Sequence, residues 1–242
     1  MAKLVWDKTG ERLYETGVKN CALYVYDAGT KAYKEGVAWN GITAITESPS
    51  GAEANPLYAD DIKYLNLISN EDYACSIEAY MYPDAFAECN GEKIVMAGTG
   101  SSAHDIGLRI SQQARSMFAI AYRTTVGNDV LNNEYGYKLH IVYNCLAAVS
   151  ERAYTTINDS PEAMTFSWEV STTPEQVAGY RPIAHMEIDS NAATSTHLAA
   201  LEGYLFGTDA STGTNPTTDK PPKLLMPAQV IACLTDGTLP TE

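Results

Sequence analysis

The stretch Tyr73-Ala-Cys-Ser-Ile-Glu-Ala-Tyr-Met-Tyr82 has the alternation of side chains that is typical of a half-buried β-strand. Because successive side chains of a strand point to opposite faces, Cys75, Ile77 and Ala79 fall on one side and the small or polar residues between them on the other. Pro83 follows, and proline cannot donate a backbone hydrogen bond to a sheet. The stretch therefore predicts a strand with one buried face that ends before Pro83.

Short runs of the same kind recur on both sides of this stretch. They are rich in valine, isoleucine, threonine and tyrosine, which favours strands over helices. Further strands are predicted at 21–26, 36–46, 93–97, 116–124, 136–148, 163–172 and 183–188. The first two would form a hairpin across Asp27–Thr30, and polar loops are predicted at 127–136 and 157–161. The predicted fold class is mainly β, an antiparallel β-sandwich or barrel.

Helical signals are few. Helices are predicted at 83–90 as a short flanking helix, at 194–206, and as one or two turns at 227–234. The second is the strongest, because Leu198, Leu201 and Leu205 recur at helical spacing and Gly207 can end the helix.

The region after this helix has few hydrophobic residues. Residues 207–223 are rich in threonine, proline, glycine and aspartate, a composition typical of a flexible linker. We therefore expect a β domain at 1–206, followed by a flexible linker and a short C-terminal segment at 207–242.

The charge of the chain excludes some functions. The 242 residues carry 16 basic and 30 acidic side chains, which gives a formal net charge of −14. A protein with this negative charge is not expected to bind nucleic acid through its phosphates or to dock on an anionic membrane surface. With 45% hydrophobic residues, the chain can nevertheless bury roughly 70–75% of its unfolded surface as a globular protein.

The cysteines and the start of the chain indicate a cytoplasmic origin. Five cysteines, widely spaced and without a C-x-x-C pair, favour reduced and mostly buried thiols over disulfides or a zinc site: Cys21, Cys75, Cys89, Cys145 and Cys233. Met1–Lys8 has no apolar run typical of a signal peptide, and no stretch approaches the ~20 apolar residues of a membrane span. We expect synthesis in a cytoplasm and no membrane insertion.

Residues 47–72 form a long loop arm that carries unusual apolar content. Connections longer than about 12–15 residues are usually functional or disordered, and this one holds too much aliphatic and aromatic surface to stay in water. We expect it to pack on another subunit. The candidate inter-subunit residues are Leu57, Tyr58, Asp60, Asp61, Ile62, Tyr64, Leu65 and Leu67.

One glycine motif imitates a nucleotide site. Ile94–Ala103 reads as a strand followed by G-x-G-x-x-A. The acidic residue expected about 20 residues later is missing between Asp105 and Asp129, and 116–124 looks like a strand. A flexible Gly/Ser loop is the better interpretation.

Other polar residues give no catalytic or metal signature. Ser101, Ser102, His104 and Asp105 are too close in sequence to form a Ser-His-Asp triad by the usual geometry. The four histidines, His104, His140, His185 and His197, have no metal-ligand spacing. His140 falls in a predicted strand, which suggests a paired sheet residue. The acidic pairs 60–61 and 71–72 read as solvated charge. No catalytic, cofactor or metal site is predicted.

Several stretches carry a resemblance to a known family: Trp6–Val18, Gly36–Glu53, Leu57–Leu65, Tyr122–Thr124, Gly136–His140 and Ile157–Ala163. Across them, from residue 6 to about 206, the chain resembles the major tail tube proteins of long-tailed, siphovirus-like bacteriophages. The resemblance implies a β-sandwich or barrel of tail-tube type, flanked by the helix at 83–90 and extended by the arm at 47–72.

The resemblance also implies a function without chemistry. Such subunits form rings, expected to be hexameric, that stack into the conduit through which DNA is ejected into the host. The implied partners are other copies of the chain, tape-measure proteins, tail-terminator and tail-tip proteins, and passing double-stranded DNA without specific binding. The implied location is the virion, and no enzyme activity or cofactor is implied.

Two other functions stay open from the sequence. A carbohydrate-binding or adhesion β-module is suggested by the β fold, the 16 tyrosines and the three tryptophans Trp6, Trp39 and Trp168. A nucleotide-dependent enzyme would have to use residues 94–103.

Overall fold

The structure is a computed structural model that describes all residues except 1–2, 52, 158, 160–161, 210–218 and 241–242. The large sheet contains β1 (Leu13–Asp27), β2 (Ala32–Tyr33), β3 (Val37–Trp39), β4 (Ile42–Glu47), β9 (Ala74–Ala79), β12 (Phe118–Asn128), β13 (Asn132–Ala147), β14 (Phe166–Thr172) and β15 (His185–Asp189). Smaller two-stranded ribbons are formed by β5 (Ser50–Gly51) with β8 (Glu71–Asp72), β6 (Ala54–Ala59) with β7 (Ile62–Ile68), and β10 (Lys93–Ala97) with β11 (His104–Ile110).

The large sheet closes on itself. Its strands follow the order β2-β1-β12-β13-β14-β9-β4, and neighbouring strands pair antiparallel. At one end β3 pairs with β1, and at the other β4 pairs with β9. Only Asn40 and Gly41 separate β3 from β4, so this bent segment joins the two ends into a barrel. The predicted mainly β, antiparallel fold class is confirmed.

The barrel is filled by side chains that alternate along its strands. In β9 the residues predicted to share one side of the strand, Cys75, Ile77 and Ala79, are all buried. They belong to a core cluster with large aromatic residues, among them Trp39 and Trp168, whose rings lie 5.6 Å apart. Alternation with a period of two therefore sets which side of each strand faces this core.

The predicted helix at 83–90 is shorter than expected, which corrects that prediction. Only Asp84–Phe86 is helical, as a single 3-10 turn (η1), and the segment then continues in turns. The reason is burial: Phe86 is fully enclosed, with its ring 4.4 Å from that of Trp39 and 5.1 Å from that of Trp168. The segment packs on the barrel core as a compact turn with irregular hydrogen bonds, in which the N–H groups of Cys89 and Asn90 both bond the carbonyl oxygen of Phe86. A second 3-10 turn, η2, spans Gly100–Ser102.

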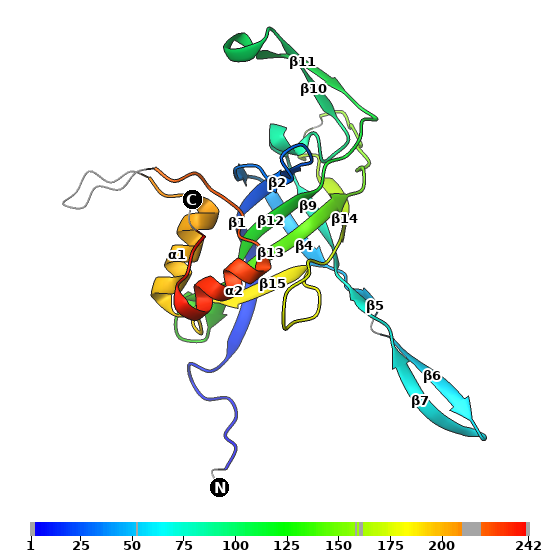
Figure 1. Ribbon diagram of the computed structural model, residues 1–242. Coiled ribbons are helices and arrows are strands. Elements are labelled where there is room, and N and C mark those ends of the chain that lie inside the picture. Colours follow the sequence, from blue (N-terminus) through cyan, green and yellow to red (C-terminus); the bar gives the residue numbers. More distant parts are fainter. Residues whose placement is uncertain (1–2, 52, 158, 160–161, 210–218, 241–242) are drawn as a thin grey trace, which may run out of the picture.

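Two helices cover the outer face of β1, β12 and β13 (Figure 1). They are α1 (Ser195–Phe206) and α2 (Pro227–Asp236), and α1 confirms the helix predicted at 194–206. Leu198, Leu201 and Leu205 of α1 are buried, as their spacing predicts. Val230 and Cys233 of α2 are buried in the same cluster.

The core thus continues across the domain boundary predicted at residue 206. Tyr24 donates a hydrogen bond of 2.5 Å to the carbonyl oxygen of Leu205, and Tyr143 donates one of 3.0 Å to that of Leu225. At the described ends of the predicted linker, Thr208 and Lys220 form an antiparallel bridge. Residues 210–218, like parts of the loop predicted at 157–161, lie outside the described residues.

Several strands extend beyond their predicted ends. β1 begins at Leu13 instead of residue 21, and β12 and β13 extend through most of the polar loop predicted at 127–136. The strand predicted at 36–46 is divided into β3 and β4, which pair with different neighbours. Among the described residues, no helix has the length and apolar character to cross a membrane.

Candidate functional site

The arm predicted at 47–72 is a β-hairpin, which corrects the expectation of a loop. β6 and β7 pair antiparallel and stand away from the barrel, on the shorter ribbon of β5 and β8 (Figure 1). Every described residue of β6 and β7 is exposed in the single chain. The described part of the arm (residues 48–51 and 53–72) is thus a projecting ribbon without core residues of its own.

A two-residue turn closes the tip of the arm. Asp60 and Asp61 have positive φ angles of 51° and 61°, between the paired residues Ala59 and Ile62. Both angles match a type I′ turn, whose twist suits the strands of a hairpin, and aspartate tolerates this backbone region better than most residues. The two carboxylates therefore define the turn and point the charged end of the arm into solvent.

The register of the hairpin sorts the predicted residues onto two faces. Leu57 lies opposite Leu65, Ala59 opposite Ile62, and Asn55 opposite Leu67, so these six side chains share one face. Tyr58 lies opposite Lys63 on the other face, and Tyr64 occupies the irregularity between the two pairs. We call the first set, Asn55, Leu57, Ala59, Ile62, Leu65 and Leu67, the aliphatic face of the arm.

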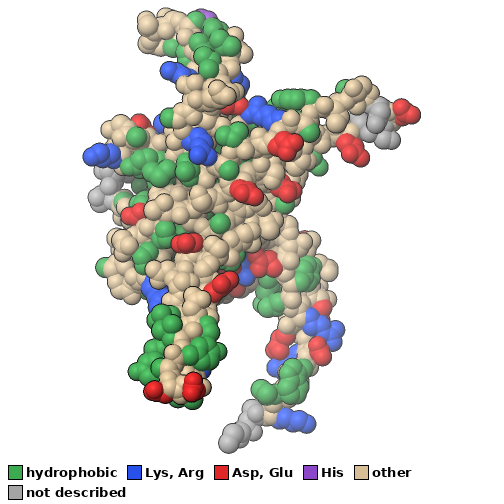
Figure 2. Space-filling model, turned by 90° about the vertical axis from the view of Figure 1, so that its right-hand side faces the viewer, with side chains coloured by type: hydrophobic (Ala, Val, Ile, Leu, Met, Phe, Trp, Pro, Cys, Tyr) green, Lys and Arg blue, Asp and Glu red, His purple; other side chains and the backbone are tan. Residues whose placement is uncertain are grey.

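The aliphatic face is open to solvent in the single chain. Leu57 and Leu65 are 44% and 38% exposed, and Ile62 and Leu67 are 65% and 54% exposed. Figure 2 shows hydrophobic side chains gathered along this ribbon above its acidic tip. The structure thus brings together all eight residues predicted for the inter-subunit site, on one hairpin.

The root of the arm depends on a glycine. Gly51 has a φ of +83°, and a Cβ atom at this position would lie 2.2 Å from the carbonyl oxygen of Asn70. Only glycine accepts both the backbone angle and the close approach. The pairing of Gly51 with Glu71, where the arm leaves the barrel, therefore requires this residue.

A second projecting hairpin was not predicted as a functional element. β10 and β11 stand away from the barrel at the opposite end from the arm (Figure 1). Ile106, Leu108 and Ile110 of β11 are each about half exposed, as is Met96 of β10. The signal in the sequence was the apolar alternation at 106, 108 and 110, which the glycine motif before it obscured.

The glycine motif at 94–103 is the turn of this second hairpin. Gly98 and Gly100 lead through η2 into β11, so a strand follows the glycines where a nucleotide site needs a helix. Asp105 accepts a hydrogen bond from the backbone N–H of Gly107, and His104 contacts the carbonyl oxygen of Ser102. Both contacts are with backbone groups two residues away in the chain. Among the described residues, no serine hydroxyl is hydrogen-bonded to His104, so Ser101, Ser102, His104 and Asp105 do not form a triad.

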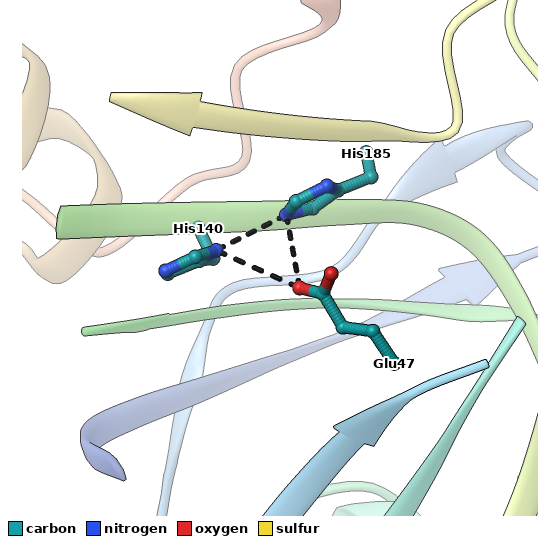
Figure 3. A group of neighbouring side chains, drawn as sticks. All are labelled: Glu47, His140 and His185. Atoms are coloured by element: carbon teal, nitrogen blue, oxygen red, sulfur yellow. Dashed lines mark hydrogen bonds and ion pairs between the residues drawn. The ribbon is translucent and has the colours of Figure 1, made fainter. Parts of the chain in front are cut away.

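The structure brings together three polar residues that the sequence left apart. His140 lies on β13, His185 on the adjacent β15, and Glu47 at the end of β4, where the arm begins (Figure 3). The Nδ1 atom of His140 is 3.1 Å from Nε2 of His185, and Oε1 of Glu47 is 3.9 Å and 3.7 Å from these two atoms. His140 is a paired sheet residue, as predicted, but its ring also belongs to this cluster.

Aromatic rings hold the two imidazoles in place. The ring of Tyr122 stacks on His140 at 4.7 Å, and the ring of Tyr73 stacks on His185 at 4.7 Å. The hydroxyl of Tyr122 also donates a hydrogen bond to Glu47. Tyr73 directly follows the arm and Glu47 directly precedes it, so the cluster contacts both ends of the arm's root.

Burial sets the protonation state of the cluster. It lowers the pKa of His140, although the carboxylates of Glu187, Glu47 and Glu15 act to raise this pKa. Burial likewise lowers the pKa of His185. Both rings are therefore neutral at neutral pH, and each offers a nitrogen lone pair.

The cysteines and tryptophans belong to the core. All five cysteines are buried free thiols, as the sequence predicts. Burial raises the pKa of Cys75 to about 12, so its thiol stays protonated and unreactive. Trp39 and Trp168 are buried inside the barrel, and Trp6 is exposed.

Comparisons with known proteins give only distant structural likeness. Neither a scan against protein-family models nor a search of curated protein sequences gives a match. A chain of the PVC sheath–tube complex of an extracellular contractile injection system, in its extended state, matches with 10% identity and a TM-score of 0.30, covering 70% of this chain and 88% of that one. A chain of the six-fold symmetrised baseplate of the anti-feeding prophage matches with 8% identity and a TM-score of 0.31, covering 76% and 97%. Likeness at this level does not assign a function.

Proposed function

We propose that this chain is a structural subunit of a phage-type tail tube, and that it self-assembles by laying its arm on the next copy. The observation that carries the proposal is the exposed aliphatic face of the arm, on a ribbon that contributes nothing to the core of its own chain. The sequence resemblance to tail tube proteins supports it, since that family uses an arm at this place in the chain.

The exposed side chains of the arm supply a driving force for association. Fully burying one large apolar side chain stabilises by about 1.5–3 kcal/mol. Covering the four on the aliphatic face that are roughly half exposed, Leu57, Ile62, Leu65 and Leu67, therefore yields about 4 kcal/mol. Association costs an estimated 4–15 kcal/mol in lost translational and rotational freedom. One arm contact is therefore weak alone, and stable assembly requires further surface or the closure of a ring.

The shape of the arm favours a ring or tube over a simple dimer. An arm that packs on a different surface of the next copy makes a heterologous contact, and such contacts repeat until a ring closes or a filament grows. The second hairpin provides a separate exposed apolar ribbon at the other end of the barrel, suited to contacts between rings. Hexameric rings that stack into a conduit for DNA ejection are the assembly we propose.

The first prediction tests the arm directly. Leu57→Asp combined with Leu65→Asp places two unpaired charges on the aliphatic face, and burying them against another subunit is strongly unfavourable. We expect the wild-type protein to form rings or tubes in negative-stain electron microscopy, and the double variant to sediment as a folded monomer with an unchanged circular dichroism spectrum.

Lys63→Asp is the matched control for this variant. It changes the net charge by the same −2, but on the opposite face of the same hairpin. We expect it to assemble. If the double variant still forms tubes, the arm is not the interface; if Lys63→Asp blocks assembly equally, charge and not the aliphatic face controls it. A wild-type protein that stays monomeric at high concentration would overturn the proposed function.

The proposed role as a tube subunit also determines the partners and the location of the protein. In a tail, the tube would contact tape-measure, tail-terminator and tail-tip proteins, and DNA would pass without specific binding. The net charge of −14 supports such passage, because a negative wall repels the phosphates of duplex DNA. The proposed location is the virion, after synthesis in the host cytoplasm.

The carbohydrate-binding alternative loses two of its three tryptophans. It rested on aromatic rings free to stack on sugars, but Trp39 and Trp168 are enclosed in the barrel. Tyr58 and Tyr64 are exposed on the arm outside its aliphatic face, and Trp6, Tyr80, Tyr154 and Tyr180 are exposed elsewhere. Glycan binding by a protein that does not self-associate would favour this alternative.

A further inference from the structure

The cluster of Glu47, His140 and His185 offers three ligand atoms of the kind that transition metals prefer. Imidazole nitrogen and carboxylate oxygen are both common ligands of zinc-class ions. The edges of the triangle formed by the two nitrogens and Oε1 of Glu47 measure 3.1, 3.7 and 3.9 Å. A tetrahedral ion with bonds of about 2.0–2.1 Å holds its ligand atoms about 3.3–3.4 Å apart. The edge between the two nitrogens is therefore about 0.2–0.3 Å too short for a metal-ligand triangle, and the two edges to Glu47 are about 0.3–0.6 Å too long.

The two rings need a small turn to bind an ion. Their centroids lie 5.4 Å apart with planes 10° apart, so at a nitrogen separation of 3.1 Å they meet edge to edge and share a hydrogen bond. A tetrahedral ion on the Glu47 side of the line between the nitrogens requires each ring to turn by about 35°. Binding would replace this hydrogen bond with two metal–nitrogen bonds, and the proton that the two nitrogens share would move to Nδ1 of His185, which keeps that ring neutral.

Groups behind the ligands suit a metal site. A metal-bound histidine usually donates its second N–H to a carboxylate, carbonyl or hydroxyl group. The Nε2 atom of His140 lies 3.0 Å from Oγ1 of Thr124 and 3.6 Å from Oε1 of Glu15, and Thr124 is itself hydrogen-bonded to Glu15. The hydroxyl of Tyr122 donates to Oε1 of Glu47, the same oxygen that faces the two nitrogens. Because Thr124 donates its proton to Glu15, it accepts one from Nε2–H of His140. The lone pair of His140 is then on Nδ1, the nitrogen that faces the triangle.

The charge around the cluster favours a cation. Three carboxylates surround it, those of Glu15, Glu47 and Glu187, and Lys138 pairs with two of them, Glu15 and Glu187. The third, Glu47, has no cationic lysine or arginine partner among the described salt bridges. A cleft of about 700 Å³, lined by Tyr73, Arg181 and His185 among others, borders the cluster at His185.

We propose that Glu47, His140 and His185 bind a divalent transition-metal ion of the zinc class, and that this ion ties the root of the arm to the barrel. Glu47 comes from the strand that enters the arm, whereas both histidines belong to the adjoining strands β13 and β15. A bound ion would thus join the arm's root to the middle of the sheet and restrict the direction in which the arm projects. This inference does not depend on the proposed tail function.

The test is metal binding by the purified full chain. Protein stripped with a chelator is titrated with Zn²⁺ by isothermal calorimetry, and with Co²⁺, whose visible absorption reports tetrahedral nitrogen and oxygen ligands. We expect one ion per chain, and at least a tenfold loss of affinity in His185→Ala and in Glu47→Gln. Amide exchange at residues 47–51 and 71–73 should slow when Zn²⁺ is added to the wild type.

His104→Ala is the control, because His104 is exposed on the second hairpin and contacts only the carbonyl oxygen of Ser102 among the described contacts. It should bind like the wild type. Glu47→Gln keeps the size and most hydrogen-bonding capacity of the side chain, so it separates loss of a ligand from loss of the fold, which circular dichroism checks. No saturable binding by the wild type, or equal binding by His185→Ala and His104→Ala, would overturn the inference, whether or not the chain forms tubes.

Discussion

Gly51 shows how a single residue sets the geometry of the arm. Its positive φ and the 2.2 Å approach of the Asn70 carbonyl oxygen to the position of a Cβ atom leave room for no other residue. Because this contact lies where the ribbon leaves the barrel, a small displacement there changes the direction of the whole arm.

The second prediction follows from this contact. Gly51→Ala should weaken the pairing of β5 with β8 by about 1–3 kcal/mol, through backbone strain and the clash together. Amide hydrogen exchange at residues 50–51 and 71–72 should accelerate about tenfold or more, since 1.4 kcal/mol corresponds to a factor of ten.

Gly179→Ala is a control for placing an alanine at a left-handed backbone position outside the arm. Gly179 has nearly the same φ, +84°, but nothing within 4 Å of the position of its Cβ atom. It shares the backbone strain without the clash, so exchange at the root of the arm should not change. Equal behaviour of the two variants at residues 71–72 would show that the contact with Asn70 has no role.

At the same scale, the sequence could not predict the Glu47–His140–His185 cluster. The three residues lie on three strands, and none belongs to a short metal-binding motif. Their approach depends on the pairing of β13 with β15 and on the path of β4 next to the arm, which are properties of the whole barrel. A search for local spacing has no access to such contacts.

At the scale of elements, the sequence predicted strands with a strong alternation and missed the weaker ones. β9 was found because Cys75, Ile77 and Ala79 alternate with polar residues. The first half of β1 was missed, since it is exposed and contains Gly17 and Asn20, which are unfavourable in strands. The arm was located by its apolar content, but its hairpin turn was hidden because Asp60-Asp61 replaces the usual Asn-Gly or Asp-Gly.

The third prediction concerns α2, which the sequence suggested only as one or two turns after a flexible linker. Val230→Asp places a charge in the cluster that α2 shares with α1 and the sheet, and should lower the free energy of unfolding by about 3–5 kcal/mol. Ala228→Asp lies on the exposed side of the same helix and should change it by less than about 0.5 kcal/mol.

Chemical denaturation of the two variants, measured under conditions that keep them monomeric, gives the answer. If Val230→Asp is as stable as Ala228→Asp, α2 does not contribute to the stability of the barrel. A clear difference shows that α2 completes the fold.

At the scale of the whole molecule, the net charge opposes the association that the arm promotes. Copies with a charge of −14 repel each other, and dissolved salt screens this repulsion over a Debye length that falls from about 30 Å at 0.01 M to about 8 Å at 0.15 M. Apolar contact is not weakened by such screening.

The fourth prediction is therefore that salt promotes assembly. Between about 0.01 and 0.5 M NaCl the assembled fraction, measured by sedimentation velocity at fixed protein concentration, should increase. The Leu57→Asp, Leu65→Asp variant should stay monomeric throughout. Dissociation of the wild-type assembly on adding salt would mean that ion pairs, and not the aliphatic face, hold the subunits together.

The separation of the arm from both core clusters has a consequence for how such a chain can change over time. Mutations on the ribbon leave the free energy of folding almost untouched, so its surface can drift, acquire new specificity or be grafted from one barrel to another without endangering the scaffold. Recognition and architecture are thus encoded in different stretches of the polypeptide, and selection can act on one while preserving the other.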